Sequence, residues 1–184
     1  MNLFYKLASL MGLVVVVSNY LVQFPVNYLG LSDVLTYGAF TYPITFLITD
    51  LSNRAYGKVV AKKIVYIGFF IGVVLTLLVS TNFSDSISIR IAIGSGLAFF
   101  ISQSLDVKIF DLLRKKTWYI APLTSSIFGS IVDTFLFFSI AFYATEVPWL
   151  TLALGDLIVK MIMALSMLIP FRLLLSTIRE ISKA

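Results

Sequence analysis

The sequence contains no cysteine and no histidine. Without cysteine the chain forms no disulfide, no thiolate metal site and no cysteine nucleophile. Without histidine it lacks the commonest zinc ligand and the commonest general base, which leaves Lys160 as the one base suited to activating a serine. A phosphate-binding P-loop and a glycine-rich dinucleotide motif are also missing. We therefore expect neither an enzyme, nor a resident cofactor or metal, nor direct use of ATP.

Charge is also scarce, because only 12% of the 184 residues are charged while 59% are hydrophobic. Soluble domains have about 25% charged and about 45–50% apolar residues. The mean hydropathy of +0.99 is that of a membrane protein. A net charge of +5 is compatible with nucleic-acid binding. The basic residues cluster in short loops between apolar runs, however, which indicates membrane topology and no nucleic-acid partner.

Six apolar runs are each near the ~20 residues that a helix needs to cross a lipid bilayer. The first is longer than the core of a signal peptide and contains Asn19 and Gln23, so we interpret it as a retained span. The loops are too short for a soluble domain. We predict an all-α, polytopic membrane protein in which residues 1–184 form one domain of six transmembrane helices, at about 7–26, 34–53, 63–81, 87–107, 118–143 and 149–174.

Positive and negative residues occupy alternate loops. The acidic loops hold Asp33, Asp85 and Glu146, with Arg90 as their one nearby base. The positive-inside rule places the basic loops in the cytoplasm, and with them both termini. The basic groups are Lys6; Arg54, Lys58, Lys62 and Lys63; Lys108, Arg114, Lys115 and Lys116; and Arg172, Arg179 and Lys183.

Ionisable residues fall near the predicted centres of the last two spans. Asp133 and Lys160 lie near the midplane, and Asp156 lies one turn from Lys160 on the same face. Because an isolated charge at this depth costs at least ~2.5–3.5 kcal/mol, we expect Lys160 to pair with one of the two aspartates. Such a pair either locks two helices together or marks a transport pathway. Asn19 and Gln23 lie at a similar depth in the first span.

A second polar cluster is predicted toward the cytoplasmic ends of the second and fourth spans. Asp50 and Arg54 are four residues apart and can form an ordinary pair on one helix face. The cluster is either a gate at the cytoplasmic end or the binding site itself, and the sequence leaves both interpretations open. Its members are Thr49, Asp50, Arg54, Gln103 and Asp106.

The second span also carries Tyr42 and Thr45 on the stripe that continues to Thr49. Pro43 removes one backbone donor from this helix. In a membrane span a broken turn is tolerated where a neighbouring helix or a cavity satisfies the free carbonyl. The stripe is therefore either part of a binding cavity or a packing kink.

Five stretches carry a resemblance to a known family: SNYLVQFPV from Ser18, YPITFLITDLSNRAYG from Tyr42, QSLDVKIFDLLR from Gln103, WYIAPLTSSIFGSIVDTFLFFSIAF from Trp118 and DLIVKMIMALSMLIP from Asp156. On these the chain resembles the bacterial queuosine precursor transporters, within a wider group of vitamin uptake transporters. Ser130 departs from the asparagine that the family pattern has after Phe-Gly.

The resemblance implies a transporter in the bacterial inner membrane that imports 7-cyano-7-deazaguanine, 7-aminomethyl-7-deazaguanine or both, for salvage into tRNA queuosine. The partner is then a small, planar, purine-like substrate. A carboxylate can accept from its guanine edge, amides can bind the opposite edge, and a tyrosine can stack on the ring. The candidate binding residues are Asn19, Gln23, Tyr42, Thr45, Asp133, Asp156 and Lys160.

The alternative is a substrate-capture subunit of a multi-subunit energised importer of the vitamin type. Such a subunit docks its partner through small residues near the start of the first helix, and Ala8 and Gly12 have that spacing. The sequence leaves the energy source open, and with it the choice between a homo-oligomer and an energising partner.

Overall fold

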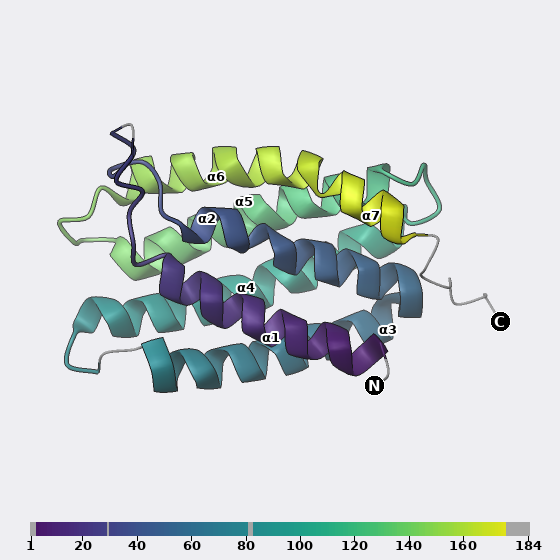
Figure 1. Cartoon of the computed structure of the whole chain (residues 1–184), viewed down its shortest axis with the longest axis horizontal. Coiled ribbons are helices and arrows are strands. Elements are labelled where there is room, and N and C mark those ends of the chain that lie inside the picture. Colours follow the sequence, from purple (N-terminus) through teal and green to yellow (C-terminus); the bar gives the residue numbers. More distant parts are fainter. Residues whose placement is uncertain (1–2, 29, 81–82, 176–184) are drawn as a thin grey trace.

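The computed structural model describes residues 3–28, 30–80 and 83–175. Long helices run side by side along the length of the molecule (Figure 1). In the described ranges the chain has no β-strand, only an isolated bridge between Pro25 and Thr36. The prediction of an all-α fold is confirmed. The elements are α1 (Leu3–Leu21), α2 (Gly38–Thr41), α3 (Pro43–Leu75), the π-helical turn η1 (Thr76–Ser80), α4 (Ser86–Leu113), α5 (Ile120–Phe142), α6 (Trp149–Ser166) and α7 (Leu168–Leu174).

Within the described residues, five helical stretches are long and apolar enough to cross a membrane. One of them, Gly38–Leu78, contains 41 residues and covers most of both the second and the third predicted span. The number of membrane crossings and the side of the termini stay predictions. The five stretches are Phe4–Leu21, Gly38–Leu78, Ser86–Leu113, Ile120–Phe142 and Trp149–Leu174.

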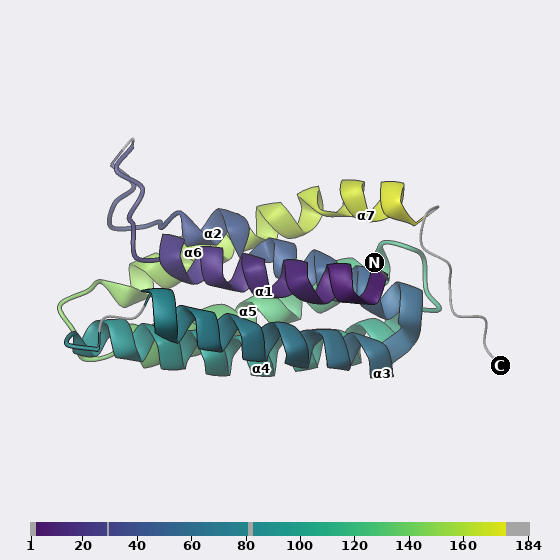
Figure 2. The same ribbon diagram turned by 60° about the horizontal axis from the view of Figure 1, so that its bottom comes forward.

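Helix α3 folds back on itself at Gly57, whose φ of 78° and ψ of 172° belong to a region that essentially only glycine adopts. Two contacts with α1 prove the reversal. Ser18 is hydrogen-bonded to Thr41 before the bend, and Asn19 to Thr76 after it, each over 2.9 Å. A straight helix would separate positions 41 and 76 by about 50 Å. The two halves of α3 are therefore antiparallel (Figures 1 and 2).

Helix α1 packs closely against the second half of α3. Ala8 and Gly12 are buried in this contact, and a Cβ on Gly12 would lie 2.7 Å from Cγ2 of Ile71. Small residues let two helix backbones approach each other. The small-residue pair that was considered as a docking point for a partner is therefore covered by the chain's own helix.

Two helix boundaries differ from the predicted spans for local reasons, and the start of α4 agrees to within one residue. Helix α1 ends at Leu21 rather than at 26, because the chain turns before the bridge at Pro25. Helix α4 begins where Asp85 accepts hydrogen bonds from the backbone N–H groups of Ile87 and Ser88, both over 3.1 Å. The last span is divided between α6 and α7, since Pro170 has no N–H to donate to the preceding turn.

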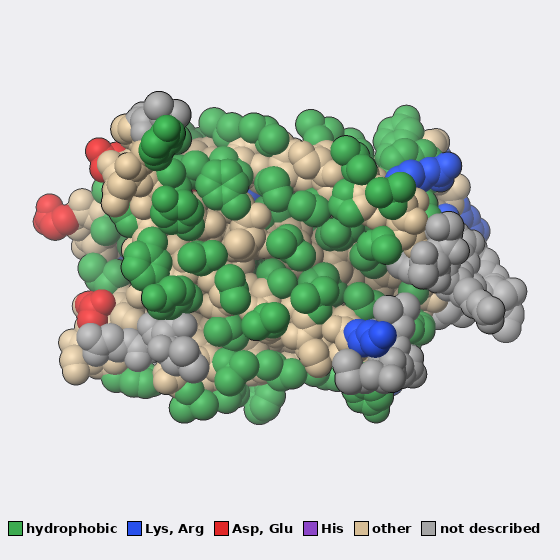
Figure 3. Space-filling model, viewed as in Figure 1, with side chains coloured by type: hydrophobic (Ala, Val, Ile, Leu, Met, Phe, Trp, Pro, Cys, Tyr) green, Lys and Arg blue, Asp and Glu red, His purple; other side chains and the backbone are tan. Residues whose placement is uncertain are grey.

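The surface has the layout expected of a membrane protein. Hydrophobic side chains cover most of the face seen in Figure 3, acidic side chains gather at one end, and lysine and arginine gather at the other. The interior is unusually polar in comparison, because aspartates, a lysine, a glutamine and many hydroxyl side chains are buried there. Buried ionisable groups in a membrane protein commonly mark substrate or ion pathways.

Candidate functional site

Lys160 on α6 forms the centre of a buried ion cluster. Its ammonium nitrogen lies 2.8 Å from Oδ2 of Asp133 on α5 and 2.6 Å from Oδ2 of Asp156, one turn back on α6. A third hydrogen bond, of 3.1 Å, reaches Thr134 Oγ1. All three N–H donors of the lysine are therefore used. Two carboxylates share one cation, so the cluster has a formal charge of −1 when both are ionised.

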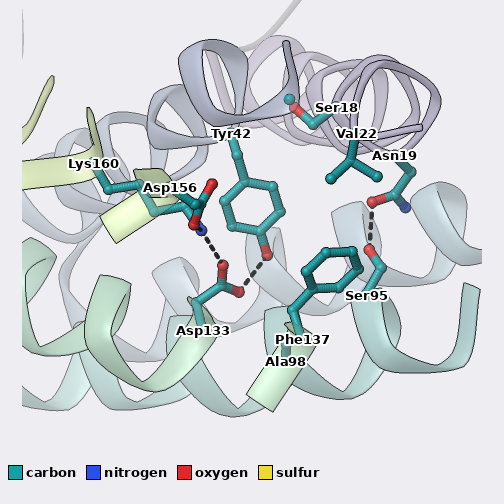
Figure 4. Close-up of a pocket in the computed structure, with 11 residues that line it drawn as sticks. Ser18, Asn19, Val22, Tyr42, Ser95, Ala98, Asp133, Phe137, Asp156 and Lys160 are labelled. Carbon is teal, nitrogen blue, oxygen red and sulfur yellow. Dashed lines mark hydrogen bonds and ion pairs between the residues drawn. The ribbon is translucent and has the colours of Figure 1, made fainter. Parts of the chain in front are cut away.

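Asp133 is held from several elements at once. Tyr42, between α2 and α3, donates its hydroxyl to Oδ1 over 2.7 Å, and Ser102 on α4 donates to the same oxygen over 3.2 Å. The ammonium of Lys160 also lies 4.8 Å from the centroid of the Tyr42 ring, within the range of a cation–π contact. Asp133 thus connects α4, α6 and the start of α3, as Figure 4 shows for Tyr42 and Lys160.

Asp156 keeps one carboxylate oxygen free. Its Oδ2 accepts from Lys160 and, over 2.7 Å, from Thr134. Its Oδ1 accepts no hydrogen bond from any residue of the described ranges, although the side chain lines a pocket. Asp156 is therefore the carboxylate that can accept a hydrogen bond from a ligand without first losing a protein partner.

This outer pocket is narrow, with about 20 Å³ of space, which is room for only about one water molecule. Its other wall carries Asn19 on α1, which donates to Thr76 over 2.9 Å and accepts from Ser95 on α4. Phe137 stands between this amide and the Asp133 cluster (Figure 4). The pocket is therefore closed, and a planar base can enter only if side chains or helices move.

The structure brings five of the seven predicted binding residues to this pocket: Asn19, Tyr42, Asp133, Asp156 and Lys160. It does not bring the other two. Gln23 lies beyond the end of α1, is exposed, and donates to the backbone oxygen of Asn19 over 3.3 Å. Thr45 instead accepts from Gln103 over 2.9 Å and so belongs with the inner cluster. Substrate binding by the five stays a prediction.

The inner cluster forms two separate groups. Gln103 is bound between Thr45 and Thr49, and both hydroxyl groups lie on the first half of α3. Asp50 accepts hydrogen bonds from Ser125 and Ser126 of α5, over 3.1 and 3.3 Å. These contacts attach the first half of α3 to both α4 and α5.

Arg54 does not pair with Asp50, although the two are one turn apart. Its Nη1 donates over 3.1 Å to the backbone oxygen of Arg114 at the end of α4, and Arg114 donates back to the Arg54 carbonyl over 3.4 Å. The suggested ordinary i,i+4 pair is therefore wrong. Asp106 is fully buried beside Asp50, and neither of its carboxylate oxygens has a hydrogen-bond partner in the described chain.

A second, inner pocket of about 10 Å³ lies between the two clusters and has room for one water molecule at most. Its lining includes Asp50, Ser126, Ser130 and Lys160. Lys160 thus borders both the outer and the inner pocket, and its ion cluster stands between them. Thr134 and Ser102 complete that cluster. Ser102 lies on a polar stripe of α4 with Ser95 and Asp106, whereas Thr134 carried no signal beyond its position next to Asp133.

A family model described as "Putative vitamin uptake transporter" matches residues 36–175. The chain belongs to this family. The transporter is 35% identical to the "Probable queuosine precursor transporter" of Haemophilus influenzae, over 85% of this chain and 79% of that protein. It is 33% identical to the "Queuosine precursor transporter" of Escherichia coli (86% and 79% covered) and 31% identical to the "Probable queuosine precursor transporter" of Bacillus subtilis (89% and 83% covered). No solved structure matches.

Membership agrees with the chemistry of the transporter's interior. A closed polar pocket between apolar helices suits a solute that must cross a membrane, because binding there replaces the hydrogen bonds that the solute loses to water. The multi-pass character follows from the apolar helices and the family together.

Proposed function

We propose that the protein imports queuosine precursors, 7-cyano-7-deazaguanine and 7-aminomethyl-7-deazaguanine, across the bacterial inner membrane. The observation that carries the proposal is the buried cluster of Asp133, Asp156 and Lys160 at a closed pocket, in a chain whose relatives are named for this transport. The chain crosses the membrane six times, with the second and third crossings meeting at Gly57, and both termini face the cytoplasm.

The free oxygen of Asp156 is the first contact for the guanine-like edge of the substrate. That edge presents N1–H and an exocyclic amine, and a carboxylate can accept from both. Asn19 offers an amide on the opposite wall, and Tyr42 offers a ring face. To make room, the hydrogen bonds that hold Tyr42 and Asn19 in the closed pocket must open.

The charge of the cluster gives an order of preference. Two carboxylates and one ammonium leave one negative charge in excess, so a cationic solute is attracted more than a neutral one. The aminomethyl precursor is a cation and the cyano precursor is neutral. We therefore propose that both are transported and that the aminomethyl form binds more tightly.

The test is precursor uptake by cells that produce the Asp133→Asn variant. This variant keeps the size of the side chain but cannot pair with Lys160, so uptake is abolished while the protein still reaches the membrane. Asp111→Asn is the control, because Asp111 lies at the basic end in weak ion pairs of 3.6 and 3.9 Å. Normal uptake by Asp133→Asn would overturn the proposal.

A further inference from the structure

Asp50 on α3 and Asp106 on α4 form a buried pair of acids. Their side chains are 2% and 0% exposed, and the hydrogen bonds from Thr49 to Gln103 and from Asn53 to Val107 hold the two stretches that carry them side by side. Neither forms an ion pair with any residue between 3 and 175 that the structure describes. Two such carboxylates cannot both be ionised without a large electrostatic cost.

The site has more acceptors than donors. Asp50 receives the hydroxyl groups of Ser125 and Ser126. Ser125 and Asp50 are also polar neighbours of Asp106, but neither oxygen of Asp106 has a partner with full hydrogen-bond geometry among the described residues. Asn53 Oδ1, one turn from Asp50, is also buried without a donor, since its amide nitrogen donates to the backbone oxygen of Val107 over 3.0 Å. Buried polar atoms in native proteins almost always have partners. These orphaned oxygens therefore indicate a missing donor.

From these contacts we infer that the Asp50–Asp106 pair is a proton-binding site. A proton on one carboxyl group removes one of the two negative charges, and the O–H it forms supplies one hydrogen-bond donor to a group of oxygens that lack donors. The oxygens of Asp106 are sealed from solvent, so a proton fits where a sodium ion with its several oxygen ligands does not.

No neighbouring charge neutralises the pair in the described structure. On α3, Arg54 is directed to the Arg114 carbonyl; on α4, Arg114 and Asp111 lie 3.6 Å from each other. The acid of α5 is Asp133, already bound to Lys160. On α7, Arg172 lies 5.0 Å from the centre of the Trp118 ring. Lys160 of α6 faces Asp50 only across the inner pocket.

The inner pocket gives the proton a route to Asp50 and links the protonation of the acid pair to Lys160. Asp50 and Lys160 line the same space, so the charge of the acid pair acts on the cation that holds the substrate site. Loss of the proton attracts Lys160 inward and weakens its hold on Asp133 and Asp156. This coupling, which rests on the proposed transport function, makes uptake depend on a proton gradient; the proton site itself does not depend on that function.

Infrared spectroscopy of the purified chain tests the site without reference to transport. At neutral pH we expect the carbonyl band of a protonated, buried carboxyl group in the wild-type protein and in Asp111→Asn, which alters a half-buried acid on the same helix as Asp106. The band disappears in Asp50→Asn/Asp106→Asn, a pair of neutral substitutions of similar size. A wild-type protein without the band, or a double variant that keeps it, would overturn the inference.

Two further measurements separate the possible failures. The melting temperature of the wild-type protein is expected to be the same in sodium chloride and in choline chloride. If sodium raised it, and the Asp50→Asn/Asp106→Asn variant lost that effect, the site would bind sodium and not a proton. In liposomes, Asp106→Asn is expected to bind substrate but to lose stimulation by a proton gradient. Stimulation that persists would overturn the coupling. If wild-type protein shows the band but no uptake, the proposed function fails and the proton site stands.

Discussion

Tyr42 donates its phenolic hydroxyl to Oδ1 of Asp133 over 2.7 Å, although the two residues are 91 positions apart in the chain. The bond joins the start of α3 to the middle of α5. Because the same carboxylate also pairs with Lys160 on α6, one side chain connects three segments that surround the outer pocket. These contacts hold the segments around the pocket together, and under the proposed function they must break before a substrate can enter.

The first prediction concerns that hydrogen bond. Tyr42→Phe keeps the ring and its edge contacts with Phe46 and Phe99 but removes the donor to a charged acceptor. The free energy of unfolding is expected to fall by about 1.5–3 kcal/mol. Denaturant unfolding in detergent measures it. Tyr66→Phe is the control, since Tyr66 is exposed and stacks on Phe100; an equal loss in both variants would contradict a special role for Tyr42.

The second prediction concerns the buried cation. Lys160→Met leaves two buried carboxylates without their ammonium partner and is expected to lower the free energy of unfolding by about 3–5 kcal/mol. Adding Asp156→Asn removes one of the stranded charges and restores part of the loss. Lys58→Met is the control, because Lys58 is 3.9 Å from Asp111 at the surface, and exposed pairs contribute about 0–1 kcal/mol. If the effects of the Lys160 and Asp156 substitutions on the free energy of unfolding were simply additive, the two side chains would not interact, which would contradict the prediction.

The third prediction separates the two precursors. Asp156→Asn neutralises the carboxylate with the free oxygen but leaves the Asp133–Lys160 pair in place. We expect affinity for the cationic aminomethyl form to fall more than affinity for the neutral cyano form. Competition between labelled and unlabelled precursors measures this ratio. An unchanged ratio of the two affinities would mean that Asp156 does not contribute to the preference for a cationic substrate.

The sequence predicted the central cluster because the physics there is simple. A lysine at mid-membrane needs a carboxylate, and Asp133 and Asp156 were the acids at its depth. The structure pairs it with both. Asp106, which the sequence placed in the inner cluster, is indeed buried.

The sequence could not predict the surroundings of some side chains, because these depend on where a helix ends and on which neighbouring helix the side chain contacts. Gln23 was expected inside the first span, but α1 ends at Leu21 and leaves it exposed. Asp50 and Arg54 have the spacing of a helix pair. However, Asp50 accepts hydrogen bonds from hydroxyl groups of α5, and Arg54 donates to a backbone carbonyl at the end of α4. Such choices depend on tertiary contacts that spacing along one helix does not contain.

The fourth prediction concerns the bend. Gly57→Ala places a side chain where φ is 78° and ψ is 172°, a conformation that costs a non-glycine residue about 1–3 kcal/mol. We expect a matching loss in the free energy of unfolding, measured in detergent. Gly96→Ala is the control, because a Cβ there meets only side-chain atoms of Val73 and Phe69, at 3.3 and 3.6 Å. Full stability of Gly57→Ala would exclude a reversal of this geometry.

The fifth prediction concerns orientation, and the natural lack of cysteine makes it direct. Glu146→Cys lies at the acidic end and Lys116→Cys at the basic end, and both positions are exposed. A maleimide that cannot cross membranes is expected to label Glu146→Cys in intact cells and Lys116→Cys only after the cells are opened. The reverse pattern would place both termini outside the cytoplasm.

The most direct measurement is uptake of labelled 7-aminomethyl-7-deazaguanine by the purified chain in sealed liposomes, with the cyano analogue as competitor. We predict saturable uptake that the analogue competes for, that requires Asp133 and that a proton gradient stimulates. Tight binding without uptake would instead indicate a capture subunit that needs an energising partner. Folded protein that neither binds nor transports either compound would contradict the assignment of substrate.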